Sequence, residues 1–111
     1  MSTQPATDPI LNNKHKLEST LRKLYSRTLN KESYAIPVTH FKGGLYYITK
    51  VTEFVDTNTP EFAVTYMSHY TKVEYTRTVI NFNSIVRDSS ENLINRFTLL
   101  SREQLKTTFT K

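Results

Sequence analysis

The residues of this chain that could support catalysis are few, and their spacing does not suit it. The chain has three histidines, and no carboxylate stands near His40 or His69 at the spacing that a metal site requires. It has no cysteine, which excludes a disulfide, a thiolate metal site and a cysteine nucleophile. Neither a nucleophile elbow nor a phosphate-binding glycine loop is present. The sequence therefore predicts a protein that is not an enzyme and holds no metal or other cofactor.

Tyrosine and basic side chains instead favour a binding role. Tyrosine offers a flat ring for stacking, and arginine can hold a phosphate or a carboxylate through two parallel hydrogen bonds. Arg77 is the strongest single candidate, because a charged residue in the middle of an expected strand needs an explanation. The competing explanation is an ion pair, for which Glu53, Glu61 and Glu74 are the candidates. The predicted binding residues are His40, Lys42, Tyr46, Tyr66, Tyr70, Tyr75 and Arg77.

Three of these tyrosines have a second interpretation as core residues. Tyr46, Tyr66 and Tyr75 alternate with polar neighbours, as residues on the buried face of a strand do. Both interpretations stay open for them.

The two glycines of the chain, Gly43 and Gly44, follow His40 and Lys42 and precede a strand-forming segment. Glycine adopts positive φ at little cost, so this pair predicts a tight turn between strands rather than a phosphate cradle.

The first third of the chain predicts one amphipathic helix over residues 9–29. Asp8 can cap its first N–H groups, Pro9 suits the first helical position, and Asn30 can end it in the left-handed conformation. An apolar stripe consists of Ile10, Leu17, Leu21 and Leu24, and the basic residues Lys16, Arg22, Lys23 and Arg27 lie on the other side. The stripe either packs on the following domain or forms a dimer seam with a second copy, and the basic side is either solvated or lies along phosphates.

Beyond residue 33 the pattern changes to strands. The predicted organisation is a tail over 1–8, the basic helix over 9–30 and a β-domain over 34–108. With no helix between the strands, the fold class is mainly β with an N-terminal helix, as a small antiparallel SH3-like barrel or a curled sheet. Strands are expected over 45–55, 61–67, 73–81 and 95–100, with a short segment over 82–86, a turn over 56–60, a polar loop over 88–92 and a helical turn over 101–106.

The segment over 40–48 resembles the opening signature of a small bacterial and phage family of domains of unknown function, His-Tyr/Phe-Lys-Gly-x-x-Tyr. The similarity continues at 64–66, at Tyr75-Thr76-Arg77 with Phe82, and at Arg96-Phe97, covering roughly residues 38–100. Thr78 stands where the family usually has proline, and Tyr75 where it often has tryptophan. The resemblance implies an SH3-like β-fold and no activity.

Charge leaves two functions open. The net charge is +5, and residues 1–32 carry six basic against three acidic side chains. We expect a non-catalytic interaction module, a phage or bacterial accessory protein that binds a protein partner through an aromatic and basic face. The alternative is nucleic-acid or nucleotide binding, with Lys42 and Arg77 on phosphates and tyrosines on bases. This alternative predicts that binding weakens steeply as the salt concentration rises. Neither a membrane span nor a signal peptide is recognisable, so we expect no membrane partner and a cytoplasmic location, in the host if the chain is phage-encoded.

Overall fold

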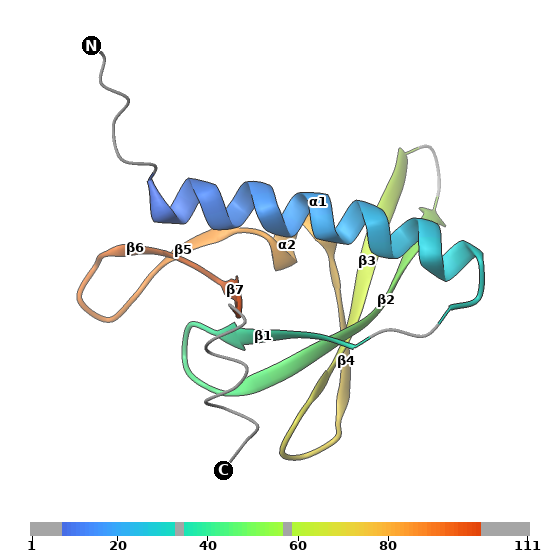
Figure 1. Ribbon diagram of the computed structural model, residues 1–111. Coiled ribbons are helices and arrows are strands. Elements are labelled where there is room, and N and C mark those ends of the chain that lie inside the picture. The colour runs from blue at the N-terminus through green and yellow to red at the C-terminus, as the bar shows by residue number, and fades with distance from the viewer. Residues whose placement is uncertain (1–7, 33–34, 57–58, 101–111) are drawn as a thin grey trace.

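The computed structural model describes residues 8–32, 35–56 and 59–100, and places one long helix across a curved antiparallel sheet (Figure 1). The elements in chain order are α1 (Pro9–Leu29), β1 (Ile36–His40), β2 (Leu45–Asp56), β3 (Thr59–Ser68), β4 (Glu74–Thr78), α2 (Val79–Phe82), β5 (Ile85–Arg87), β6 (Leu93–Asn95) and β7 (Phe97–Leu99).

The main sheet has the strand order β4-β3-β2-β1-β7, and every neighbouring pair is antiparallel. β5 and β6 form a separate two-stranded hairpin. Within the described residues β4 and β7 do not pair, so the sheet is open. The mainly β fold class is confirmed in its curled-sheet form, and the closed SH3-like barrel does not form.

The predicted helix forms, and its apolar stripe packs on the sheet of the same chain. Asp8 caps it, since its Oδ1 accepts a hydrogen bond of 2.9 Å from the N–H of Ile10. Leu17, Leu21 and Leu24 are buried in one core with sheet residues such as Val38, Ile48, Val51 and Val64. A second copy would have to displace this packing to use the three leucines as a dimer seam. Dimerisation itself stays a prediction.

Asn30 follows α1 as predicted, but not in the conformation that was expected. Its φ is −89°, and the left-handed residue is Lys31, with φ of 61°. The Lys31 N–H donates to the carbonyl of Thr28. The left-handed residue that follows the helix is therefore one position later than the sequence predicts.

Two further strand predictions need correction. The strand expected over 73–81 ends at Thr78, whose Oγ1 accepts a hydrogen bond of 3.1 Å from the N–H of Asn81 and so caps α2. β1 had not been predicted, and the last expected strand is two short strands, β6 and β7. The helical turn expected over 101–106 lies outside the described residues, as do residues 57 and 58 of the expected turn.

Neither helix of the described chain has the length and apolar character needed to cross a bilayer.

Candidate binding site

A hollow of about 190 Å³ brings five of the seven predicted binding residues together. We call it the aromatic hollow, and its lining consists of His40, Tyr46, Tyr66, Tyr75, Arg77 and Phe97. The hollow is open to solvent and lies on the same face of the sheet as the core. Tyr46 is paired with Val38 and Arg77 with Val64, and both valines are core residues.

All five strands of the main sheet contribute to the hollow. Tyr75 and Arg77 come from β4, Tyr66 from β3 and Tyr46 from β2, while His40 of β1 pairs directly with Phe97 of β7. Directly paired residues of antiparallel strands project to the same face. The site is therefore a property of the assembled sheet and not of any single segment.

The floor of the hollow is buried and its rim is exposed. Tyr66 and Phe97 are 3% and 1% exposed, and their ring centroids are 5.1 Å apart. Phe97 also stacks on Phe82, with ring centroids 4.0 Å apart and ring planes 6° from parallel. At the rim Tyr75 stacks on Tyr66 at 5.5 Å and remains 42% exposed. The tyrosines therefore divide between the two interpretations: Tyr66 is core, and Tyr75 offers a ring to solvent.

Arg77 is held in place by neutral partners. Its Nε donates to the hydroxyl of Tyr66 at 2.8 Å and its Nη1 to Oδ1 of Asn81 at 2.6 Å. The ion pair considered as the competing explanation does not form: within the described residues no carboxylate pairs with Arg77. A guanidinium has five N–H groups, so three of those of Arg77 are left without a described partner.

His40 is a neutral hydrogen-bonding group in this site. Its Nδ1 lies 3.1 Å from the backbone N–H of Lys42 and accepts from it, which leaves the ring proton on Nε2. Burial lowers the pKa of His40, and the positive charges of Arg77, Arg96 and Lys42 lower it further. Three cations therefore act on one imidazole at this end of the sheet.

The turn between β1 and β2 uses both glycines as predicted. Gly43 and Gly44 have φ of 100° and 104°, and the Gly43 N–H donates to the carbonyl of His40 at 2.8 Å. A Cβ on Gly44 would lie 3.1 Å from Cε1 of Tyr46, whereas one on Gly43 would meet nothing within 4 Å. Gly44 therefore also provides space for a ring of the hollow.

Two predicted binding residues lie outside the hollow. Lys42 is exposed and stands over the ring of Phe41, with Nζ 5.7 Å from its centroid. Tyr70 is 72% exposed in the turn after β3, where its ring contacts His69. Sequence reasoning missed Phe97 as a lining residue and Arg96 as a nearby charge, although the Arg96-Phe97 pair had been noted as part of the family pattern.

The basic side of α1 does not extend the hollow. Arg22 pairs with Glu18 at 3.5 Å and Arg27 with Glu32 at 3.7 Å. Lys16 and Lys23 are exposed, and no residue of α1 lines the hollow.

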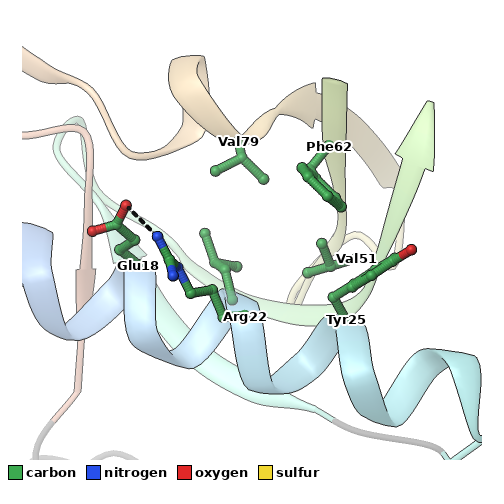
Figure 2. Close-up of a pocket in the computed structure, with 7 residues that line it drawn as sticks. Glu18, Arg22, Tyr25, Val51, Phe62 and Val79 are labelled. Atoms are coloured by element: carbon green, nitrogen blue, oxygen red, sulfur yellow. Dashed lines mark ion pairs between the residues drawn. The ribbon is translucent and has the colours of Figure 1, made fainter. Parts of the chain in front are cut away.

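A second and more apolar pocket of about 360 Å³ lies between the helices α1 and α2 and the strands β2 and β3 (Figure 2). The Tyr25 and Phe62 rings meet edge to face at 5.0 Å, and the Glu18–Arg22 ion pair stands on the helix side. Its lining consists of Glu18, Leu21, Arg22, Tyr25, Val51, Phe62 and Val79. Sequence reasoning did not predict this pocket.

Comparison with known proteins identifies the β-part of the chain. No curated protein and no solved structure gives a significant match. A family described as a protein of unknown function (DUF1653) matches residues 37–99, which include β1 except for Ile36, all of β2 to β7, and every residue that lines the hollow. α1 lies outside the matched residues. The chain therefore belongs to the DUF1653 family of proteins of unknown function.

Proposed function

We propose that this chain is a non-catalytic interaction module that binds an acidic segment of a partner protein through the aromatic hollow. The observation that carries the proposal is the state of Arg77. Tyr66 and Asn81 hold its guanidinium in place, and three of its N–H groups have no described partner. A preorganised arginine beside aromatic rings is the arrangement typical of the residues that dominate protein interfaces.

The remaining lining supports binding more than catalysis. Acid–base chemistry at His40 would need a partner carboxylate or a nucleophile beside it. Among the described residues no acidic side chain lines the hollow, and Nδ1 of His40 is occupied by the Lys42 N–H.

Nucleic acid is the second candidate, favoured by one observation. The exposed ring of Tyr75, stacked on Tyr66 next to Arg77, could receive a base while Arg77 contacts a phosphate. The basic residues of α1 give this candidate little support, since Arg22 and Arg27 are in ion pairs and none lines the hollow.

The resemblance of segment 40–48 to a bacterial and phage signature supports a role as a bacterial or phage accessory protein. A cytoplasmic location is part of the same proposal.

Fluorescence anisotropy with three labelled probes tests the function. The probes are a short peptide alternating Glu and Phe, the same peptide with Lys in place of Glu, and a single-stranded oligonucleotide. We expect the acidic peptide to bind with Kd on the order of 10–100 μM and the basic peptide not to bind. Tight oligonucleotide binding that weakens about tenfold or more from ~50 to ~200 mM salt, without peptide binding, would favour the second candidate instead.

A further inference from the structure

We propose that the aromatic hollow is a carboxylate-binding site in which the Arg77 guanidinium supplies the charge and the neutral His40 supplies a second N–H donor. The proposal rests on the proposed function in that it places the partner's acidic group in this hollow. It goes further by assigning the chemical class of the ligand and the two side chains that recognise it.

The charge around the hollow excludes a cationic ligand. Rings such as Tyr46, Tyr66 and Tyr75 also occur in cages for methylated ammonium groups. Such a cage needs a surrounding potential that is neutral or negative. Here Arg77 lines the hollow itself, and Arg96 and Lys42 are close enough to act on His40. An ammonium group would meet this field, and no carboxylate of the described part of the chain lines the hollow to offset it.

The backbone around the hollow argues against a phosphate group. Phosphate sites commonly use consecutive free backbone N–H groups, as in nests and glycine-rich loops. Three of the four amides in the glycine turn beside the hollow are occupied: the Phe41 N–H donates to Arg96 O, the Lys42 N–H to His40 Nδ1, and the Gly43 N–H to His40 O. Only the Gly44 N–H has no described partner, so the turn offers no run of consecutive free N–H groups, and the side chains are the main donors for a ligand.

Those side-chain donors match a carboxylate. The three N–H groups of Arg77 without a described partner and the Nε2–H of His40 can serve two ligand oxygens. The aromatic floor formed by Tyr66 and Phe97 would take the apolar part of the group that carries the carboxylate. At about 190 Å³ the hollow is smaller than the roughly 300–1,000 Å³ of typical small-molecule sites, as suits one side chain or chain end of a partner.

The groups that face His40 come from several elements. Arg77 and Tyr75 are on β4, Tyr46 is on β2, Phe97 is on β7, and Lys42 and Arg96 are in the adjoining turns. None of these groups is acidic, so a bound carboxylate would supply a negative charge that the described residues around His40 do not.

Three small probes that share a phenyl ring and differ in head group test the ligand class: phenylacetate, phenyl phosphate and benzyltrimethylammonium. NMR spectra of the wild-type chain at constant chloride follow the Arg77 Nε–H and the His40 ring. We expect phenylacetate to shift both signals with Kd on the order of millimolar, and the other two to bind several-fold more weakly or not at all. Stronger binding of either other probe, or no shift with phenylacetate, would overturn the proposal.

A matched pair of variants separates the site from general charge. Arg77→Gln removes the guanidinium proposed to bind the carboxylate, and Arg87→Gln removes the same charge from β5, where Nη1 of Arg87 donates to the carbonyl of Glu91. We expect the first to weaken phenylacetate binding roughly tenfold to hundredfold and the second to leave it within about twofold. Equal losses would show a long-range charge effect and contradict the site. Should Arg77→Gln fail to fold, the relative affinities of the wild-type chain for the three probes still test whether the site prefers a carboxylate.

Peptides then identify the source of the carboxylate and separate this proposal from the proposed function. One pair differs only in a free or amidated C-terminus, and the other only in an internal Glu or Gln. Loss of binding in the first pair identifies a chain end as the ligand, and loss in the second identifies a side chain. Phenylacetate binding without any peptide binding would support the carboxylate site and contradict the protein-partner function. Acidic-peptide binding that is unchanged in Arg77→Gln would contradict the carboxylate site and would place the protein-partner function at a surface other than the hollow.

Discussion

The hydroxyl of Tyr66 links the folding core to the binding surface. Its ring is 3% exposed and packs on Phe97 and Phe82, while its oxygen accepts from Nε of Arg77 at 2.8 Å. This bond ties the guanidinium to a residue of the core. Because Arg77 has no carboxylate partner within the described chain, its position depends on the Tyr66 hydroxyl and Asn81.

We therefore expect Tyr66→Phe to weaken phenylacetate binding several-fold and to lower the free energy of unfolding by about 1 kcal/mol. Tyr47→Phe is the control, because the Tyr47 hydroxyl bonds Nδ1 of His69 outside the hollow. Urea unfolding and an NMR titration measure the two effects. If both variants bind as wild type, the Tyr66 hydroxyl does not position Arg77.

A second prediction concerns the pH dependence of stability. Burial and three nearby cations lower the pKa of His40 below its usual 6.5 in the folded chain. Below that pH the unfolded chain binds the proton more readily, so the stability due to neutral His40 is complete above 6.5 and is lost as pH falls. NMR should give a His40 midpoint under 6.5, and His40→Gln should lose less stability than wild type between pH ~7.5 and ~5. A midpoint at or above 6.5 would contradict the environment described for His40.

The residue types of the site could be predicted, but their grouping only in part. Alternation and charge in the sequence identified Tyr66, Tyr75 and Arg77, which the β3–β4 register brings together. Tyr70 belongs to the same residue class yet lies in a turn, where strand alternation no longer decides the direction of a side chain. Phe97 could not be identified as lining, because its place depends on pairing with His40, 57 positions earlier in the chain.

At the level of elements, substitutions at the two glycines of the turn between β1 and β2 can distinguish the effect of backbone strain from the effect of crowding in the hollow. Both glycines have φ near 100°, so alanine at either position should cost about 1 kcal/mol or more. Only Gly44→Ala places a methyl 3.1 Å from the Tyr46 ring. We expect Gly43→Ala to retain phenylacetate binding and Gly44→Ala to weaken it, measured at a temperature where both are folded. The same loss in both would show that the turn conformation, rather than the Tyr46 ring, controls the site.

A reciprocal pair of hydrogen bonds joins α1 to the residue after α2. Nδ2 of Asn83 donates to the carbonyl of Lys14 at 3.0 Å, and Nζ of Lys14 donates to the carbonyl of Asn83 at 2.9 Å. Asn83 is 7% exposed, so Asn83→Ala should lower the free energy of unfolding by about 1–3 kcal/mol. Asn92→Ala, at an exposed loop position, should change it by less than about 0.5 kcal/mol. Urea unfolding of both variants checks this difference.

Elements with strong local signals could be predicted, and those determined by distant contacts could not. Asp8, Pro9 and the spacing of the leucines were enough for α1. Residues 79–82 look like the continuation of a strand, whereas the hydroxyl of Thr78 caps them and Phe82 is buried in the core, so they form α2. β1 is short and contains Pro37, which weakens its local signal, and it is stabilised between β2 and β7.

For the molecule as a whole, the helix and the sheet share one core, although only the β-part matches the family. Leu17 is fully buried among sheet residues. Leu17→Ala should therefore destabilise the whole chain by about 2–5 kcal/mol, with the helical circular-dichroism signal and the tyrosine fluorescence lost in one transition. Leu29→Ala, at a leucine that is 64% exposed, is the control and should change stability by less than about 0.5 kcal/mol. Two separate transitions in wild type would show that α1 folds independently of the sheet.

The shared floor of the hollow has a consequence for how this family can diverge. A substitution that reshapes Tyr66 or Phe97 alters the folding core, so it is removed by misfolding before any gain in binding can be selected. Tyr75 is 42% exposed and can change with little effect on folding. We therefore expect new partner preferences to arise by substitutions at the rim, while the shape of the floor is inherited.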